Sequence, residues 1–492
     1  MQKGKASLLF ENPVYVAGMA SVAGKKEGEG PLGKQIDVVE ADPMFGADNW
    51  EKAESAMQKQ AADLALEKGG IHRGDVRYLF AGDLLGQLIA TSFGSVDLEI
   101  PLFGLYGACS TMGEALSLGA MCVAGGHGDQ VLALASSHYA TAEKQFRFPL
   151  SYGNQRPQSA TWTVTGCGAV VLSKHPGQIL ERKTAEADGK TTRQRQVRIA
   201  GITTGKPVDL GIRDSMNMGA AMAPAAWDTI MQNFRDLEVE EGWYDRIITG
   251  DLGNVGQKVL LDLMKQEGHD LSGISMDCGL EIYDCQSQDT HSGGSGCGCS
   301  AVTLCAHILP MLFSGSWKRV LFVPTGALLS TVSYNEGQSI PGIAHGVILE
   351  SCDLENDDEN MVRKSKDQRE EGEGMTDIIK AFLTGGLICS LVQILLDRTK
   401  LMPGRVMVML VVSGGILGWL GLYEPFAEWA GAGASVPLLG FGNTLWKGVA
   451  ESMAEDGFLG IFRGGLTAAS AGITGALVFG YLGALVFKPK MK

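Results

Sequence analysis

Apolar and polar positions change their pattern along the 492 residues. Up to about residue 350, short apolar runs such as 131–136 alternate with stretches whose apolar residues recur at helical spacing, such as 301–313. Strands that alternate with helices predict βαβ units and largely parallel sheets. Residues 351–375 are charged and nearly free of apolar side chains, and residues 376–492 are again apolar. The pattern predicts a soluble α/β domain over 1–350, a flexible charged linker and an all-α membrane domain.

Four short segments of the α/β part recur in the same order in its second half. The pairs are 78–85 with 247–252, 107–110 with 297–300, 131–136 with 320–326, and 168–172 with 346–349. One apolar strand resembles another in any α/β protein, but the shared order of all four favours a duplication. The sequence therefore predicts two pseudo-repeats, about 1–175 and 195–350.

Aspartate and cysteine residues follow the repeated strands. Asp83 and Asp251 each end a strand that runs into Gly-Asp-Leu, and Cys109 and Cys297 each stand at a strand-to-helix turn. Because ligands of such folds bind at the carboxyl ends of strands, we expect these residues to share a site. A thiol at a helix N-terminus lies among unpaired N–H groups that favour its thiolate. Each aspartate could instead merely cap the helix that follows it.

With a cysteine at the turn of its first copy, the duplicated half resembles the thiolase and ketoacyl-synthase fold, a layered α-β-α-β-α arrangement. Within that superfamily, the strings AGDLL (81–85), FGLYGACST (103–111) and MGAAMAPAA (218–226) resemble the stage V sporulation protein AD family. The apolar half, with GGLICSLVQILLD (385–397) and VVSGGILGWLGLYEP (411–425), is similar to the stage V sporulation protein AE family. The resemblance implies a fusion of two sporulation proteins.

The chain departs from the condensing enzymes of that superfamily at their catalytic partners. Where they place a histidine this chain has Asp251, and where they place an asparagine it has Cys297 or Gly298. A carboxylate would repel a developing oxyanion, so the departure favours a degenerate binding protein. The rival is a membrane-anchored acyl-CoA condensing enzyme with Cys109 as nucleophile and His291 as the missing imidazole. A third interpretation is an assembly protein with a vestigial pocket.

The resemblance also implies a ligand, pyridine-2,6-dicarboxylate (dipicolinate), which is moved during sporulation and germination. Calcium would belong to that ligand, and no cofactor is expected. A flat dianion suits backbone N–H groups at a helix start, hydroxyl groups and an arginine fork. Asp83 and Asp251 could ligate the chelated Ca²⁺, which prefers hard oxygen ligands. The expected ligand-binding residues are Asp83, Cys109, Ser110, Ser136, Ser137, His138, Arg147, Asp251 and Cys297.

Three apolar runs, 378–396, 406–423 and 466–487, have the length of membrane spans. Between the last two, residues 426–446 are apolar but interrupted by glycine and proline, which predicts a re-entrant loop or an interfacial loop. The glycines at 414 and 418 suit close helix contact. Because three spans are few for a pore, we expect a homo-oligomer or another membrane subunit. The resemblance implies stage V sporulation protein AC as partner, and the spore inner membrane or forespore membrane as location.

Composition limits the remaining classes of function. The net charge is -14 and no basic cluster is present, which excludes a nucleic-acid partner. The ten cysteines contain no CxxC pair, which indicates free thiols in a reducing compartment. Cys297 and Cys299 have C-x-C spacing, but no second pair supports a zinc site.

Overall fold

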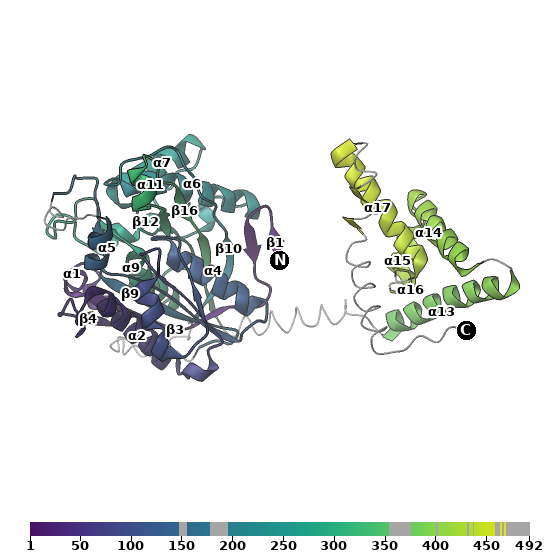
Figure 1. Ribbon diagram of the computed structural model, residues 1–492, viewed down its shortest axis with the longest axis horizontal. Coiled ribbons are helices and arrows are strands. Elements are labelled where there is room, and N and C mark those ends of the chain that lie inside the picture. Colours follow the sequence, from purple (N-terminus) through teal and green to yellow (C-terminus); the bar gives the residue numbers. More distant parts are fainter. Residues whose placement is uncertain are drawn as a thin grey trace. The chain divides into compact units, whose positions relative to one another are not determined.

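The computed structural model describes residues 1–146, 155–177, 195–353, 375–399, 402–430, 432–435, 437–457, 463–464 and 467–468 (Figure 1). The chain divides into two compact units, Met1–Asp357 and Asp358–Lys492. The larger unit is built on a mixed β-sheet, and the described part of the smaller unit is helical.

The sheet of the larger unit runs in the order β12-β11-β14-β17-β10-β3-β9-β7-β5-β6. In that order the strands are β12 (Ser275–Asp277), β11 (Arg246–Thr249), β14 (Arg319–Val323), β17 (Gly346–Asp353), β10 (Arg195–Thr203), β3 (Tyr15–Gly24), β9 (Gly166–Ser173), β7 (Gln130–Ser137), β5 (Tyr78–Asp83) and β6 (Leu102–Gly104). From the central pair β3 and β10 outwards, each half makes two antiparallel pairings followed by two parallel ones. The two halves therefore repeat one topology.

The predicted duplication is confirmed by this topology. The repeated segments fall on equivalent strands, β5 with β11, β7 with β14 and β9 with β17. The two cysteine turns begin equivalent helices, α4 (Thr111–Ala124) and α9 (Cys297–Thr303). The expectation of largely parallel sheets is wrong in the centre. There β9 and β17 each lie between two strands of their own half and run antiparallel to both.

Helices form three layers around the two halves of the sheet. Helix α4 packs on β5 and β7 of its own half and reaches β17, whereas α9 packs on β7 and β9 of the other half. A π-helical turn (Leu304–Ile308) continues α9 into α10 (Leu309–Phe313). The outer faces are covered by α2 (Trp50–Gly69) on the first half and by α6 (Met218–Leu237), packed with α7 (Gly253–Gln266), on the second. The layered α-β-α-β-α arrangement is thus confirmed.

Shorter elements complete the larger unit. They are β1 (Gln2–Lys3), β2 (Ser7–Leu9), α1 (Lys25–Gly28), β4 (Val38–Glu40), α3 (Ile89–Gly94), α5 (Tyr139–Phe146), β8 (Trp162–Thr163), α8 (Cys278–Glu281), β13 (Gly294–Ser295), β15 (Thr325–Ala327), α11 (Thr331–Asn335) and β16 (Gly342–Ala344). Strand β8 of the first half pairs in parallel with β13 of the second. This pairing holds a first-half segment beside the turn that begins α9.

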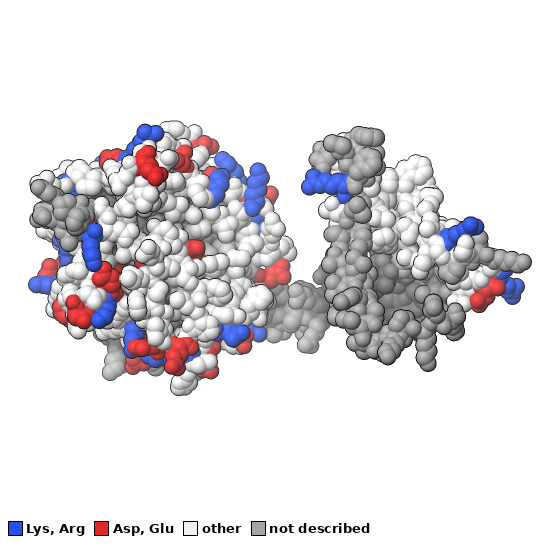
Figure 2. Space-filling model, viewed as in Figure 1, with Lys and Arg blue, Asp and Glu red and all other residues white. Residues whose placement is uncertain are grey.

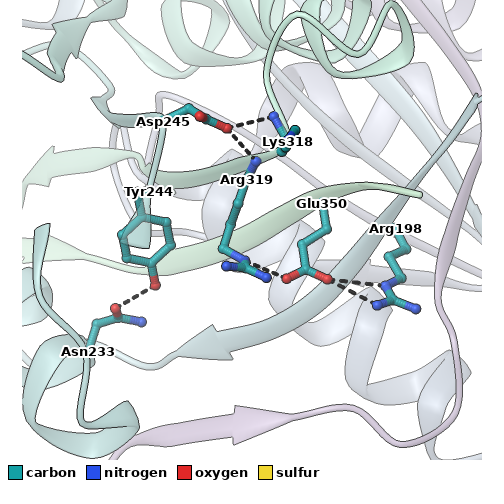
Figure 3. A network of polar contacts seen from close by, with 7 residues as sticks. All are labelled: Arg198, Asn233, Tyr244, Asp245, Lys318, Arg319 and Glu350. Atoms are coloured by element: carbon teal, nitrogen blue, oxygen red, sulfur yellow. Dashed lines mark hydrogen bonds and ion pairs between the residues drawn. The ribbon is translucent and has the colours of Figure 1, made fainter. Parts of the chain in front are cut away.

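A network of polar contacts ties three strands of the second half together (Figure 3). Glu350 of β17 accepts a hydrogen bond from Nε of Arg319 on β14 at 2.6 Å and one from Nη2 of Arg198 on β10 at 3.1 Å. The Arg319 guanidinium also lies over the ring of Trp243, 3.8 Å from its centroid. One carboxylate thus holds two guanidinium groups across the sheet.

The smaller unit contains five described helices. They are α13 (Met375–Arg398), α14 (Pro403–Trp419), α15 (Tyr423–Ala430), α16 (Ala432–Ser435) and α17 (Leu438–Asp456). Among the described residues, one helical segment, Lys380–Arg398, is long and apolar enough to cross a membrane. Charged residues of both signs lie mostly around the edge of the visible face of the larger unit, and the described face of the smaller unit is mostly uncharged (Figure 2). The third expected span, 466–487, lies outside the described residues except for 467–468, as does most of the expected linker.

The expected loop over residues 426–446 is wrong, because this segment is largely helical. Its C-terminal part forms the start of α17, which packs along α14 (Figure 1). A Cβ on Gly414 would lie 1.9 Å from the carbonyl oxygen of Leu439, and one on Gly442 would lie 2.0 Å from that of Val411. The glycines therefore allow two helix backbones to approach each other and do not interrupt the helix. The close contact expected at Gly414 is confirmed.

Candidate functional site

Cys109 lies in a tight turn between β6 and the N-terminus of α4. The residue before it, Ala108, has a φ of 48°, in the left-handed region that residues other than glycine seldom adopt. Its carbonyl oxygen accepts a hydrogen bond from the Thr111 hydroxyl at 2.7 Å and another from the Cys297 thiol at 3.1 Å. Such strain persists only where its surroundings over-determine it, and it is common at functional sites.

Gly326, on strand β15 of the second half, allows the two halves of the fold to approach each other at the Cys109 turn. A Cβ on Gly326 of β15 would lie 2.3 Å from the carbonyl oxygen of Gly107. Any larger residue at this position would push β15 away from the Cys109 turn. The preceding residue, Thr325, brings a hydroxyl group to the site from the second half.

Asp251 lies beside Cys109, in the loop between β11 and α7. Its carboxylate accepts hydrogen bonds from the N–H of Gly296 at 3.0 Å and from the Thr325 hydroxyl at 2.9 Å, and the Cys109 thiol lies close enough to affect its pKa. The side chain is buried, and burial raises its pKa to about 7. Thiol and carboxylate thus come from different halves of the duplicated fold: Asp251 occupies the position of Asp83 in the other half, and Cys109 occupies that of Cys297.

The environment of Cys109 opposes its thiolate. Burial raises the pKa of the Cys109 thiol well above its usual value, and the nearby Asp251 carboxylate and Cys297 thiol raise it further. Burial likewise raises the pKa of Cys297. Activated cysteines need the opposite, an electropositive neighbourhood that lowers the pKa.

A pocket opens above Cys109 and Asp251. Its described lining is Leu84, Tyr106, Ala108, Cys109, Ala142, Glu143, Phe146, Thr161, Thr163, Ser215, Met216, Met218, Asp251, Ser295, Ala327 and Leu329. None of the chain's eight histidines, all of which lie in described residues, is in this lining. The lining combines apolar walls with hydroxyl groups and two carboxyl groups, a composition typical of small-molecule sites.

Asp83 is not part of this lining, although the sequence paired it with Asp251. Its carboxylate accepts hydrogen bonds from the N–H of Leu85 at 3.0 Å, and from the N–H and hydroxyl of Thr91 at 3.0 and 2.7 Å. These donors belong to the start of α3 and the loop before it, so Asp83 acts as a cap there. The described residues contain no group of three or more His, Cys, Asp or Glu side chains that could hold a metal ion.

Three expected hydroxyl ligands are engaged inside the protein. The Ser110 hydroxyl donates to the carbonyl oxygen of Gly107 at 2.7 Å, and that of Ser137 donates to Val164 at 2.7 Å. The Ser136 hydroxyl donates to Glu54 at 2.8 Å and accepts from Gln58 at 2.7 Å. All three serines are buried and absent from the pocket lining, so the structure does not support them as ligand contacts.

The two histidines singled out in the sequence are also absent from the pocket lining. His138 is buried, and its Nε2 lies 2.9 Å from the carbonyl oxygen of Pro43. Nδ1 of His291 lies 2.9 Å from the carbonyl oxygen of Pro157, and its Nε2 lies 3.1 Å from Asp289. His291 therefore does not supply the missing imidazole. Arg147, the expected cation, lies outside the described residues.

Most walls of the pocket could not be found from sequence. Tyr106 and Ser295 lie next to the two cysteine turns in the sequence, and this proximity is the feature from which they could have been predicted. Glu143 and Phe146 come from α5, Thr163 comes from β8, and further walls come from the segments around residues 215 and 329. Only tertiary structure places them together.

Both halves of the chain match known sporulation families. Residues 4–350 match the family model described as Stage V sporulation protein AD, and residues 377–486 match that described as SpoVAC/SpoVAEB sporulation membrane protein. The chain is 42% identical over 347 residues to Stage V sporulation protein AD of Bacillus subtilis (strain 168), which covers 70% of this chain and 97% of that protein. It is 29% identical over 116 residues to Stage V sporulation protein AC of the same strain, which covers 22% and 77%.

Solved structures of condensing enzymes are also similar. One is 3-oxoacyl-[acyl-carrier-protein] synthase III from Aquifex aeolicus VF5, with 12% identity, a TM-score of 0.39, and coverage of 68% of this chain and 99% of that one. Another is AbyA1, described as a tetronic acid condensing enzyme, with 16% identity, a TM-score of 0.43, and coverage of 68% and 99%. At such low identity these likenesses do not extend to activity.

Proposed function

The chain belongs to the stage V sporulation protein AD family, and from this premise we propose that its Cys109 pocket binds dipicolinate. The bound form is the calcium complex, and the chain takes part in moving it across a membrane during sporulation and germination. The proposed role is binding and transport, in which the pocket performs no chemistry on its ligand.

The contact between Cys109 and Asp251 is the observation that carries this proposal. A condensing enzyme acylates its cysteine, which requires a thiolate, and then polarises a carbonyl group with hydrogen-bond donors. Here a carboxylate lies beside the thiol and raises its pKa, and the neighbouring Cys297 donates to a backbone oxygen. Both groups are thereby arranged against acyl transfer, which supports a receptor over the rival acyl-CoA condensing enzyme.

The charge of the pocket supports the calcium complex over the free dianion. Glu143 and Asp251 both line the pocket, so a bare dicarboxylate bound there would face two acidic side chains. In the complex, the two charges of Ca²⁺ balance those of dipicolinate, and a protein carboxylate can complete the six to eight oxygen ligands of the ion. Calcium is therefore part of the cargo. Asp251 replaces the pair of aspartates that the sequence suggested.

The second part of the chain supplies the membrane component of the proposal. Residues 377–486 match a sporulation membrane protein family, and α13 contains a segment long enough to cross a bilayer. Binding and membrane parts on one chain keep captured ligand at high local concentration beside the membrane. We place the protein in the spore inner membrane or forespore membrane, together with a subunit of the stage V sporulation protein AC type.

Calorimetry of the full-length protein in detergent tests the ligand. Calcium dipicolinate is expected to bind, and dipicolinate with a calcium chelator is expected to bind at least tenfold more weakly. Asp251→Asn should reduce the difference in affinity between the calcium complex and free dipicolinate, because it removes a negative charge that repels the free dianion. The absence of binding in either form would refute the proposal.

A matched control separates the pocket from the surface. Asp270→Asn removes a carboxylate on an exposed loop and should leave both affinities unchanged. Acyl-CoA turnover that is lost in Cys109→Ser would establish the rival function.

A further inference from the structure

A polar stripe lies on the exposed face of α13. Its members are Gly386, Ser390, Gln393 and Asp397, which follow one another at intervals of three or four residues and so share one side of the helix. All four are exposed. The Ser390 hydroxyl donates to the carbonyl oxygen of Gly386 at 2.8 Å, and Nε2 of Gln393 donates to Asp397 at 3.0 Å. We call this set the α13 polar stripe.

The opposite side of α13 packs against its own unit. Ala381, Thr384 and Gly385 are half-buried, and a Cβ on Gly433 of α16 would lie 2.3 Å from the carbonyl oxygen of Ala381. A helix turns about 100° per residue, which places these packed residues roughly opposite the stripe. The described helices of the unit therefore leave the α13 polar stripe uncovered.

An uncovered polar stripe is unfavourable on a membrane-spanning helix. The stripe lies within Lys380–Arg398, the segment that is long and apolar enough to span a bilayer. Asp397 is next to the end of this segment, but Gln393 is about 7.5 Å inside it at 1.5 Å per residue. Polar side chains at such depth face protein or water, not lipid. Something must therefore cover Gln393.

We propose that the α13 polar stripe is the surface through which two copies of this chain associate in the membrane. A glutamine amide carries both donors and acceptors, so it can pair with the same residue of a second copy across a two-fold axis. Phe382 and Leu383, which are 77% and 61% exposed, flank the stripe and supply apolar contact on either side of it. This inference goes beyond the proposed ligand-binding function and does not depend on it.

The native cysteines provide a test in the full-length chain. Of the ten cysteines, Cys389 alone is exposed, and it adjoins Ser390 at the edge of the stripe. Oxidation of membranes with copper phenanthroline is expected to give a disulfide-linked dimer. The dimer should disappear in Cys389→Ser and persist in Cys285→Ser, which removes a half-buried thiol of the larger unit.

Position around the helix is tested with two matched variants. In the Cys389→Ser background, Ser390→Cys should restore the dimer. Leu391→Cys, on a residue that is also exposed but lies about 100° away around the helix, should give at least fivefold less cross-linked dimer. Equal cross-linking at 390 and 391 would overturn the proposal.

The role of the amide is tested separately. Gln393→Leu should lower the cross-linked fraction about fivefold, whereas Gln393→Asn, which keeps a donor and an acceptor, should retain most of it. If residues 466–487 of the same chain or a different subunit cover the stripe, the wild type will give no cross-linked dimer, and the proposal fails. Dipicolinate binding measured on the same membranes shows that such a failure is distinct from failure of the proposed function.

Discussion

The thiol of Cys109 and the carboxylate of Asp251 lie side by side in the lining of one pocket, close enough for each to shift the pKa of the other. Cys109 comes from the first half of the duplicated fold, and Asp251 comes from the second half, at the position equivalent to Asp83. Their contact stabilises the neutral thiol and disfavours the thiolate on which acyl transfer depends.

Replacing Asp251 should therefore make Cys109 more reactive. In Asp251→Asn the carboxylate charge is gone, the pKa of the thiol falls, and its alkylation by iodoacetamide at pH 8 should accelerate about tenfold, equivalent to one pKa unit. Mass spectrometry of the Cys109 peptide measures the rate. Asp270→Asn is the control, and an unchanged rate in Asp251→Asn would mean that the carboxylate does not restrain the thiol.

Glu54 is expected to make the larger unit less stable as pH rises. It is buried on α2, accepts hydrogen bonds from Ser136 and Thr141, and burial together with Asp83 raises its pKa to about 8. The folded state thus holds a proton that the unfolded state releases near pH 4.5, so stability falls between pH 4.5 and 8 and is level above. Glu54→Gln should remove on the order of 1–3 kcal/mol of this fall.

Urea denaturation at several pH values between 5 and 8.5 measures that slope. Glu51→Gln is the control, because Lys144 lowers the pKa of Glu51 and its contribution is lost only in acid, below the same range. If the free energy of unfolding of Glu54→Gln falls with pH as steeply as that of the wild type, Glu54 is not the group responsible.

Glu350 is expected to stabilise the second half of the fold. Glu350→Gln removes the charge that holds Arg198 and Arg319 together (Figure 3), and should lower the free energy of unfolding by about 1–2 kcal/mol. The expected loss of stability is modest because both guanidinium groups are about one-third exposed, and water screens their charges. Urea denaturation checks it, with Glu336→Gln on the exposed end of α11 as a control that should change nothing.

Gly414 is expected to be essential for the contact between α14 and α17. In Gly414→Val the new side chain would meet the carbonyl oxygen of Leu439, and this overpacking should cost about 1–3 kcal/mol. Thermal unfolding of the helical signal in detergent measures the loss. Gly415→Ala, whose Cβ would lie 3.5 Å from the oxygen of Gly442, should be tolerated. Equal melting of the two variants would contradict the close packing.

The duplication could be read from the sequence because each half repeats its strand ends, where backbone geometry restricts the choice of residues. Cys109 and Asp251 were found in this way. The partners of Ser136 could not be found, since Glu54 and Gln58 come from a helix about 80 residues earlier. A hydroxyl group at a strand end is the same in sequence whether it faces a ligand or a buried carboxyl group.

The membrane half shows a different limit. Glycine lowers helix propensity in water, so Gly440 and Gly442 predicted a loop. In the fold, Gly442 lets the backbone of α17 approach Val411 of α14, and the sequence pattern alone cannot place such a partner.

Protection of Cys109 by ligand tests the central claim most directly. The full-length protein is alkylated with and without calcium dipicolinate, and labelling of Cys109 is compared with that of half-buried Cys285, which is absent from the pocket lining. If the pocket is the binding site, saturating ligand slows labelling of Cys109 at least tenfold and leaves Cys285 unchanged. Equal labelling of Cys109 with and without bound ligand would contradict the account.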